Sequence, residues 1–207
     1  MVPVSEPTLA IVILAAGCSS RLGQAKQLVK IGQQSLLVRQ CQLALSISAN
    51  VTCVLGFQAE RMGDEIAPLK IQSMVNPDWQ KGLSNSIAFG IKTLTPNIDG
   101  IMLILVDQWQ LCQADLNKLV NSWRQVPEKI VCASIDNGDN DKSIFGPPVI
   151  FPKRYFPELI ALEKGSGAKA IIKQYKDNVI FIPMAEAFTD LDTPEQLVRL
   201  QRFFNQD

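Results

Sequence analysis

The most informative stretch of this sequence lies near the N-terminus and runs Ile11-Val-Ile-Leu-Ala-Ala-Gly-Cys-Ser-Ser-Arg-Leu-Gly-Gln-Ala-Lys26. Its apolar beginning is typical of a buried strand, and the strand ends in two alanines and Gly17. Small residues let backbone N–H groups approach an anion closely, while Arg21 and Lys26 add positive charge a few residues later. The stretch therefore predicts a strand followed by a phosphate-binding loop.

The loop differs from two common phosphate-binding motifs. The Gly-Lys-Ser/Thr ending of a Walker A loop is missing, and so is the G-x-G-x-x-G of a dinucleotide site. An ordinary turn between a strand and a helix, with exposed basic side chains, is the structural alternative. The hydroxyls of Ser19 and Ser20 beside Arg21 favour phosphate binding.

Other short apolar runs predict buried strands at Ala10–Leu14, Val51–Leu55, Ile71–Val75, Ile101–Val106, Ile130–Ser134 and Val179–Ile182. Most are rich in Val and Ile and apolar nearly throughout, as expected for strands covered on both faces. Helical spacing between or after them gives apolar faces that contain Leu37 and Cys41, Ile87 and Ile91, Leu116 and Leu119, and Leu197 and Leu200. The alternation predicts a doubly wound α/β fold with a mostly parallel sheet and helices on both faces. Ligands should bind beyond the carboxyl ends of the strands.

The length and composition indicate a single domain. The chain has 207 residues, of which 47% are hydrophobic, and this is enough to bury a core. No segment is typical of a linker, so we expect one domain over residues 1–207, with a flexible N-terminus at 1–8. The 20 basic and 20 acidic residues balance, so no overall field attracts nucleic acid or an anionic membrane. We expect neither as a partner.

Two residue types narrow the chemistry further. Histidine is absent, which excludes Ser-His and Cys-His catalysis and most transition-metal sites. Five cysteines are scattered without the close pairs of a zinc or redox motif, which fits a reducing, cytoplasmic location. Leu9–Ala16 is too short for a membrane anchor and lacks the basic flank of a signal peptide. The remaining candidates for chemistry are carboxylates, Lys, Arg, hydroxyls and a metal with oxygen ligands.

Three acidic residues are candidates for metal binding. Asp107 comes directly after the strand 101–106, at the sheet edge where ligands bind, so its carboxylate could hold Mg²⁺ against phosphate oxygens. The alternative for Asp107 is a helix cap or a turn. Asp190 and Asp192 flank Leu191, which places both carboxylates on one face if the segment is extended. The alternative for this pair is a favourable charge at the start of the following helix.

Hydroxyl residues mark two predicted helix starts. Thr193–Gln196 is typical of a capping box, with Pro194 at the first helical position. Ser84 and Ser86 follow a polar loop at the start of another helix, where hydroxyls and free N–H groups can hold a base or a phosphate. A helix cap is the more common role for such serines.

Three segments are rich in turn residues. Phe145–Val149 and Lys164–Lys169 could each line a pocket or form only a turn. Asp136–Lys142 is expected to be a plain polar loop. Calcium binding there is disfavoured, because Asp141 and Pro147 stand where an EF-hand loop needs glycine and glutamate.

Together these residues resemble the molybdenum-cofactor-related nucleotidyltransferases, and most closely the molybdenum cofactor cytidylyltransferases. The family pattern L-A-A-G-x-S-x-R-M-G-x-x-K is matched from Leu14 to Lys26, with Leu22 in place of methionine. Further matches follow in the family's order at Asn76-Pro-Asp-Trp79 with Gly82-Leu-Ser-Asn-Ser-Ile87, Leu105-Val-Asp-Gln108, Gly146-Pro-Pro-Val-Ile-Phe151 and Asp190-Leu-Asp-Thr-Pro-Glu195. The matches cover almost the whole chain.

The resemblance implies a Rossmann-like nucleotidyltransferase fold, a Mg²⁺ cofactor, and transfer of CMP from CTP to the terminal phosphate of the molybdenum cofactor (molybdopterin). The implied catalytic residues are Arg21, Lys26 and Asp107, and the implied metal ligands are Asp107 and Asp192. The implied nucleotide-binding residues are Leu14, Ala15, Ala16, Gly17, Ser19, Arg21, Lys26, Ser84 and Ser86. Further candidates are Asp190, Lys169, Gly146 and Pro148. Implied partners are CTP, a phosphorylated pterin, and a molybdoenzyme or its chaperone in transient contact.

The sequence motifs indicate the type of reaction more clearly than the identity of the nucleotide and the acceptor. The Ala-Ala-Gly turn favours CTP, because guanylyl-transferring relatives carry Ala-Gly-Gly, and GTP is the alternative. Trp109 stands where the family usually has proline, Gly165-Ser166 replaces Asp-Lys, and Lys169 takes the place of arginine. These departures fall on the acceptor side, so methylerythritol phosphate or a sugar phosphate is an alternative acceptor. A non-catalytic accessory protein that binds nucleotide and cofactor for a molybdoenzyme is the alternative from another class.

Overall fold

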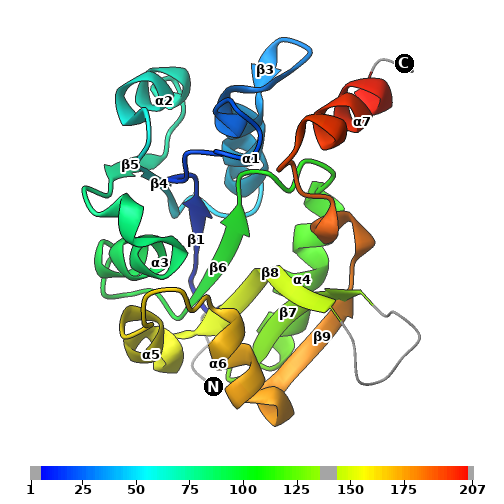
Figure 1. Cartoon of the computed structure of the whole chain (residues 1–207). Helices are drawn as coiled ribbons and strands as arrows, with labels where there is room; N and C mark the ends of the chain where they lie inside the picture. Colours follow the sequence, from blue (N-terminus) through cyan, green and yellow to red (C-terminus); the bar gives the residue numbers. More distant parts are fainter. Residues whose placement is uncertain (1–5, 136–143, 205–207) are drawn as a thin grey trace.

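The fold is built on a seven-stranded sheet in a computed structural model that describes residues 6–135 and 144–204 (Figure 1). The strands are β1 (Leu9–Leu14), β4 (Val51–Leu55), β5 (Gln72–Val75), β6 (Gly100–Leu105), β7 (Ile130–Ile135), β8 (Ile144–Pro152) and β9 (Val179–Pro183). Their spatial order is β5-β4-β1-β6-β8-β7-β9. All pairings are parallel except those of β8, which runs antiparallel to β6 and β7. The predicted Rossmann-like, mostly parallel sheet is confirmed.

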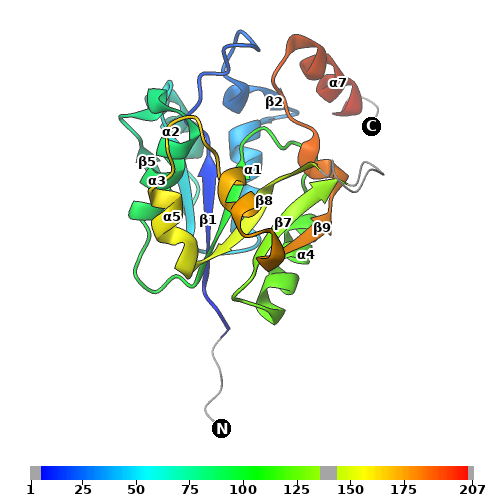
Figure 2. The same cartoon turned by 60° about the horizontal axis from the view of Figure 1, so that its bottom comes forward.

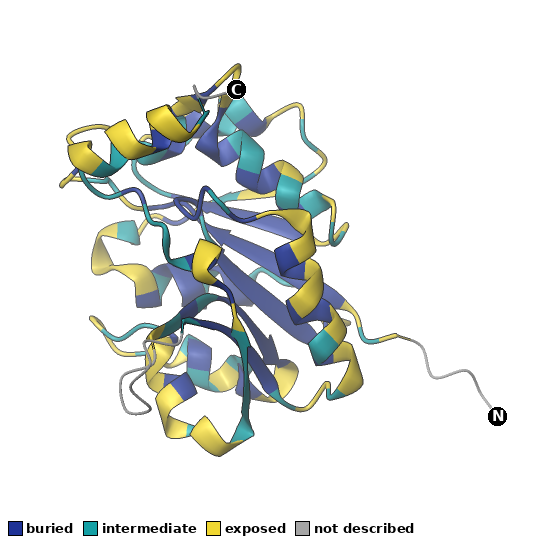
Figure 3. Ribbon diagram, turned by 90° about the vertical axis from the view of Figure 1, so that its right-hand side faces the viewer, coloured by how far each residue is buried: buried dark blue, intermediate teal, exposed yellow. Residues whose placement is uncertain are grey.

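Helices cover both faces of this sheet, as predicted (Figures 1 and 3). Side chains of β1 alternate between two apolar clusters, with Ile11 and Ile13 in one and Ala10 and Val12 in the other. The first cluster includes residues of α1 (Leu36–Leu45), α2 (Ala59–Ile66) and α4 (Gln113–Gln125). The second includes residues of α3 (Leu83–Lys92), α5 (Phe156–Ile160) and α6 (Lys169–Gln174). The continuous apolar strands are therefore buried from both sides.

A third layer of structure lies beyond the carboxyl ends of the strands. It contains the hairpin of β2 (Lys30–Ile31) and β3 (Gln34–Ser35) and the last helix, α7 (Pro194–Phe204). Figure 2 shows β1 pointing toward the end of the molecule that holds β2 and α7. Leu191 and Leu200 from the C-terminal segment pack there with Leu22 and Trp109. This small core brings α7 and the segment before it to the sheet edge where the sequence predicts ligand binding.

The predicted strands correspond to β1, β4, β5, β6, β7 and β9, and the predicted helical faces belong to α1, α3, α4 and α7. Helices α2, α5 and α6 were not predicted, because five to eight residues are too few for a clear period of 3.6. Short 3-10 helices connect these elements at Lys26–Leu28, Trp79–Lys81, Lys153–Tyr155, Lys176–Asn178 and Ala185–Phe188.

Of the two alternatives for Phe145–Val149, lining a pocket or forming only a turn, the turn is wrong, because this segment lies inside β8. Cys132 of β7 pairs with Val149, but the next residue, Ala133, pairs with Gly146. Pro147 and Pro148 are the extra residues of a β-bulge, where they need no ladder N–H. Two prolines therefore lie within the sheet without ending the strand. Because Gly-Pro-Pro is typical of turns, the sequence did not predict a strand here.

Two sequence predictions fall partly or wholly outside the described residues. Residues 1–5 of the predicted flexible N-terminus and the polar run Asp136–Lys142 lie there. Thr8, at the end of the first segment, donates its N–H to the carboxylate of Asp99 at 2.8 Å. The single-domain organisation stays a prediction. Within the described ranges, no helix combines the length and apolar character needed to cross a membrane.

Candidate active site

The loop after β1 is held in shape by Gln27, a fully buried residue of the first 3-10 helix. Its side-chain amide donates to the backbone carbonyls of Ala15 at 2.8 Å and Gly17 at 2.7 Å. Ser19 adopts a left-handed conformation with φ of 53°, and its hydroxyl accepts from the backbone N–H of Lys26 at 3.3 Å. These bonds fold the loop back over the end of β1, so Lys26 lies beside the sheet edge.

Lys26 joins two acids that are distant in sequence. Its Nζ donates to Oδ2 of Asp107 at 2.5 Å and to Oδ1 of Asp192 at 2.9 Å. Arg21 contacts the other oxygen of Asp192 at 2.6 Å. The structure thus brings together four residues that the sequence singled out, with the basic side chains paired to the acidic ones.

The electrostatics of this cluster favour its charged forms. Burial acts to lower the pKa of Lys26, but the charge of Asp107 and hydrogen bonds to Asp107 and Asp192 raise it above its usual value. Burial acts to raise the pKa of Asp192, but contacts with Lys26 and Arg21 hold it below its usual value. Asp190 behaves in the opposite way. Its burial, followed by the charges of Asp107 and Asp192, raises its pKa from 3.8 to about 6.

Asp107 is positioned by its neighbour Gln108, which is buried. The Gln108 side chain accepts from the N–H of Leu105 at 3.0 Å and donates to the carbonyls of Pro147 at 2.6 Å and Ala187 at 2.7 Å. Asp107 itself is only 5% exposed. It is not a helix cap, because α4 begins at Gln113 and is capped at Cys112. The capping alternative for Asp107 is therefore wrong.

A cavity of about 480 Å³ opens beside these charges. Of the predicted site residues, its lining includes Leu14, Ala16, Gly17, Arg21, Lys26, Ser86, Asp107, Asp190 and Asp192. The other lining residues are Cys18, Gln27, Trp79, Gln80, Gly82, Leu83, Leu105 and Val106. Its volume is within the range of pockets that hold nucleotide-sized ligands. The carboxyl ends of β1 and β6 meet there, as expected for an open α/β sheet.

The start of α3 forms another part of the cavity wall, through Gly82, Leu83 and Ser86. Ser84 and Ser86 are buried, and the helix is preceded by Gly82 without a side-chain cap, so the capping alternative for these serines is wrong. The Ser86 hydroxyl instead accepts from Nδ2 of buried Asn76 at 3.2 Å. Helix N-termini present unpaired backbone N–H groups, which suit an anion or a polar base edge.

Trp79 shapes the same wall, and its position depends on a neighbouring glycine. A Cβ atom at Gly56 would lie 2.6 Å from the Trp79 side chain and 2.7 Å from the carbonyl oxygen of Ala16. The Trp79 ring also packs edge-on against Phe57 at 5.8 Å. Gly56 therefore permits a close approach between the end of β4 and the cavity wall.

The segment before α7 supplies the remaining acids. Asp190 and Asp192 both line the cavity, as their spacing predicted. The predicted capping box is confirmed, because Gln196 accepts from the N–H of Thr193 at 3.0 Å while the Thr193 hydroxyl accepts from the N–H of Gln196 at 3.4 Å. Gln196 also accepts from the N–H of Asp192 at 2.7 Å, which fixes the backbone beside the carboxylate.

Several predicted site residues lie away from the cavity lining found in residues 6–135 and 144–204. They are Ala15, Ser19, Ser84, Lys169, Gly146 and Pro148. Ala15 and Ser19 support the loop through the bonds above. Lys169 places its ammonium 4.9 Å from the centre of the Phe145 ring, and Gly146 accepts from the thiol of Cys132.

Sequence reasoning gave no role to Gln27, Trp79 or Gln108. Gln27 and Gln108 bond to backbone atoms of distant segments, which a single sequence does not reveal. Trp79 belongs to the matched Asn76–Trp79 motif, and that motif was the available signal.

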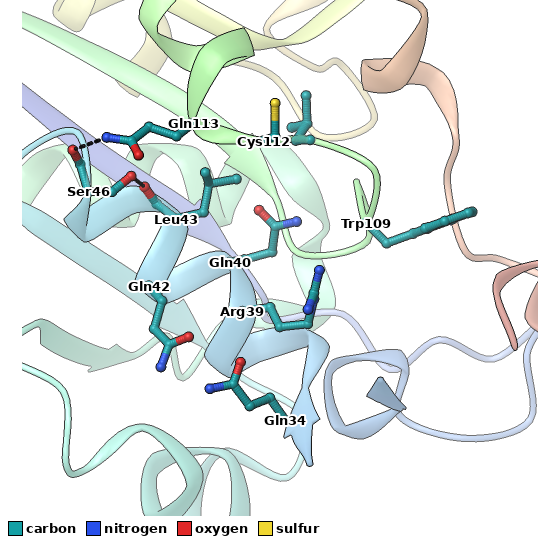
Figure 4. A pocket seen from close by; sticks show the side chains of 10 residues that line it. Gln34, Arg39, Gln40, Gln42, Leu43, Ser46, Trp109, Cys112 and Gln113 are labelled. Carbon is teal, nitrogen blue, oxygen red and sulfur yellow. Dashed lines mark hydrogen bonds between the residues drawn. The ribbon is translucent and has the colours of Figure 1, made fainter. Parts of the chain in front are cut away.

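A second cavity, of about 360 Å³, lies between α1 and the loop that follows Asp107 (Figure 4). Its lining is mostly polar and comprises Gln34, Arg39, Gln40, Gln42, Leu43, Ser46, Trp109, Leu111, Cys112 and Gln113. Gln40 donates to the backbone carbonyl of Gln108 at 2.7 Å, while its buried Oε1 has no partner among the described residues. This cavity contains none of the acids of the Lys26 cluster.

Known proteins resemble this chain in sequence and in fold. Purine catabolism protein PucB of Bacillus subtilis (strain 168) is 28% identical over 209 residues, which are 95% of this chain and 98% of that protein. The crystal structure of Rv0371c from Mycobacterium tuberculosis H37Rv superposes with a TM-score of 0.81 at 23% identity, over 96% of this chain and 100% of that one. CMP:2-keto-3-deoxy-manno-octonic acid synthetase complexed with CTP has a TM-score of 0.73 at 13% identity, over 96% and 99%.

A family model gives the assignment directly. The model described as the MobA-like NTP transferase domain matches residues 11–179, from the first strand to the beginning of the last. This range is well over half of the chain and contains Lys26 and Asp107. The protein therefore belongs to the family of MobA-like NTP transferase domains.

Proposed function

We propose that this protein is a Mg²⁺-dependent cytidylyltransferase that transfers CMP from CTP to the terminal phosphate of the molybdenum cofactor (molybdopterin) and releases pyrophosphate. The observation that carries the proposal is the contact of Lys26 with Asp107 and Asp192 beside the cavity. This arrangement supplies a cation for phosphate oxygens and carboxylates for a metal at one place. Family membership supports the reaction type, while the choice of CTP and of the pterin rests on the sequence motifs.

The carboxylates suit Mg²⁺ in their chemistry. Mg²⁺ prefers oxygen ligands, and it is often held by one or two carboxylates together with substrate phosphates. Oxygens of Asp107 and Asp192 lie within 2.9 Å of one ammonium nitrogen, so a single cation already contacts both. No group of three or more acidic or thiol side chains in the described part of the chain could hold a metal alone. Phosphate oxygens of the nucleotide would therefore complete the coordination.

The proposed chemistry needs no general base. An ionised oxygen of the acceptor phosphate attacks the α-phosphorus of CTP in line, and a P–O bond forms. The bond to the β-phosphate oxygen breaks, and its electron pair leaves with pyrophosphate. Lys26 and Arg21 would stabilise the leaving group, while Asp107 and Asp192 would hold the metal. When bound, Mg²⁺ would neutralise charge that develops on the phosphates.

Replacement of Asp107 tests the metal-binding role. Asp107→Asn keeps the size of the side chain but removes its charge, so pyrophosphate release should fall by roughly 100-fold or more. Asp177→Asn, at an exposed aspartate of a distant 3-10 helix, is the matched control and should retain activity. Circular dichroism would verify the fold of both variants. Near-normal turnover of Asp107→Asn would remove Asp107 from the mechanism.

The nucleotide preference is tested by radiolabelled pyrophosphate release with each of the four NTPs, Mg²⁺ and molybdopterin. CTP should give the fastest release, and a clear preference for GTP would contradict the cytidylyl assignment. Methylerythritol phosphate and a sugar phosphate serve as alternative acceptors. CTP binding without any release would instead identify a non-catalytic accessory protein.

We also propose a cytoplasmic location and transient transfer of the product to a molybdoenzyme or its chaperone. All five cysteines are free, which is usual in a reducing compartment. The name of the bacterial relative refers to purine catabolism. For this chain we propose only that its product is used by an enzyme that needs the modified cofactor, without naming the pathway of that enzyme.

A further inference from the structure

We infer that the acceptor binds in a third cavity, of about 320 Å³, where its flat ring system packs against an aromatic wall that contains Trp109 and Phe203. The cavity lies between the loop after Asp107, the segment before α7, and α7 itself. Its lining comprises Trp109, Gln110, Phe188, Thr189, Asp190, Gln196, Arg199 and Phe203. The inference rests on the proposed function, because it assumes that the site transfers a nucleotide to an acceptor.

The position of this cavity suits an acceptor. Asp190 lines both this cavity and the one beside Lys26, so the two spaces adjoin at one side chain. A molecule in the third cavity could therefore direct a terminal phosphate past Asp190 toward the nucleotide. The cavity with unpartnered Gln40 shares Trp109 but none of the acids, and no described side chain connects its lining to Lys26.

The walls match a conjugated heterocycle better than a polyol. Three aromatic side chains, Trp109, Phe188 and Phe203, provide stacking surface. Gln110, Thr189 and Gln196 add polar groups that can bond the edge of a heterocycle. A sugar or erythritol phosphate has no π face and cannot stack ring on ring with these side chains.

Trp109 is the buried base of this aromatic wall, with 7% of its surface exposed, whereas Phe203 is 54% exposed. The Trp109 ring lies 5.2 Å from that of Phe203 and 5.7 Å from that of Phe204, both edge-on. Arg39 places its guanidinium 5.0 Å from the centre of the Phe204 ring on the other side of this aromatic cluster. Trp109 occupies the position where the resembling family usually has proline. This replacement of proline by tryptophan is one of the departures that leave the acceptor's identity undetermined by the sequence. It gives this chain an acceptor surface that the family pattern lacks.

The charged residues of this lining are one cation, Arg199, which can pair with an anionic acceptor, and one acid, Asp190, which lies where the two cavities adjoin. Arg199 is an exposed cation on the cavity wall, and a phosphorylated heterocycle is negative at neutral pH. On the opposite side of the sheet edge, Lys169 is already placed over Phe145 and does not line any of the cavities described here. Among residues 6–135 and 144–204, Arg199 is the one basic residue in the lining of the aromatic cavity.

The test measures acceptor binding without nucleotide, by titration calorimetry on the full chain. The probe is a pterin with a phosphate on its 6-methyl group, and erythritol phosphate is the non-aromatic comparison. Phe203→Ala and Arg199→Gln should each weaken pterin phosphate binding by about tenfold. Val198→Ala and Arg202→Gln change exposed residues of the same helix outside the cavity lining and should stay within twofold of the wild type. Thermal unfolding of each variant verifies that α7 remains folded.

The outcomes separate this inference from the proposed function. Unchanged pterin phosphate affinity in both cavity variants, equal effects in the controls, or no binding of the probe to the wild type would each overturn the acceptor cavity, even if CTP turnover is observed. Tenfold losses confined to Phe203→Ala and Arg199→Gln, with the affinity for CTP and Mg²⁺ unchanged, would support it. The same losses without any pyrophosphate release would keep the cavity and reject the transferase function.

Discussion

Lys26 contacts Asp107 and Asp192, the carboxylates proposed to bind the metal. In the nucleotide-free site its ammonium therefore competes with a metal ion. A triphosphate would offer Lys26 new anionic partners and release the carboxylates. Metal and nucleotide binding should thus strengthen each other by exchange of ionic partners.

Removal of this ammonium gives a testable separation of the two binding events. Lys26→Met should tighten Mn²⁺ binding to the nucleotide-free protein by about tenfold, because two carboxylates lose their internal cation. The same change should weaken CTP binding and reduce turnover by roughly 100-fold. Electron paramagnetic resonance of free Mn²⁺ measures the first effect. Lys30→Met, at an exposed lysine of β2, is the control, and weaker Mn²⁺ binding by Lys26→Met would contradict the competition.

Asp190 makes stability depend on pH. Its pKa is raised to about 6 by burial and then by the neighbouring acids, so the native state holds this proton more tightly than the unfolded chain does. Stability from this proton is present below about pH 4 and is lost as pH rises through 6. Asp190→Asn should therefore be more stable than the wild type at pH 7.5, but not at pH 3.5.

The expected difference for Asp190→Asn is about 1 kcal/mol at pH 7.5. For a fully buried carboxyl group, a rise of the pKa from 3.8 to about 6 would correspond to roughly 3 kcal/mol. The expected value is smaller because Asp190 is partly exposed to solvent, which screens its charge. Urea unfolding in EDTA at both pH values measures the difference without bound metal. A difference independent of pH would contradict the role of the carboxyl group.

At the level of elements, Gln108 fastens three segments that belong to different parts of the chain. Its side chain connects the end of β6, the bulge of β8 and the 3-10 helix Ala185–Phe188. Helix α7 adds a second connection, since its first turn bonds beside Asp192 and its aromatic end packs against Trp109. The acids from β6 and from the segment before α7 are thus located by two independent sets of contacts.

Gln108→Ala should lower the free energy of unfolding by about 2–4 kcal/mol, because one N–H and two carbonyl groups lose a buried partner. Gln125→Ala, at the exposed end of α4, should change it by less than about 0.5 kcal/mol. Denaturant unfolding measures both values. A loss for Gln108→Ala as small as that of the control would show that water replaces these bonds at little cost.

For the whole molecule, local patterns were sufficient for most of the framework. Strands such as β1 and β6 are continuous apolar runs. Helices such as α4 repeat apolar residues every three to four positions, which is typical of a helix and not of a strand. Parallel strands end at one edge, so the meeting of Lys26 and Asp107 could be expected. The bulged strand β8 could not be expected, because its prolines are tolerated only as the unpaired residues of the bulge opposite β7.

The site was predicted in its charged residues but not in their partners. Phosphate binding by Lys26 and Arg21 stays a prediction. Their contacts with Asp192, an acid from the far end of the chain, were not predicted. The buried amides of Gln27 and Gln108 were not predicted, because their partners are backbone carbonyls brought near only by the tertiary fold. Spacing along the chain identifies which groups gather at an edge, and packing decides how they pair.

The close approach at Gly56 has a consequence for how this family could diversify. Gly56 does not line the cavity beside Lys26, whereas Trp79 and Ala16 do. Any carbon added at Gly56 would displace the Trp79 side chain or the carbonyl of Ala16. The width of the cavity therefore depends on Gly56, a residue that lies behind the lining side chains. A substitution at Gly56 alone could change the shape of the cavity while every residue that lines it stays the same.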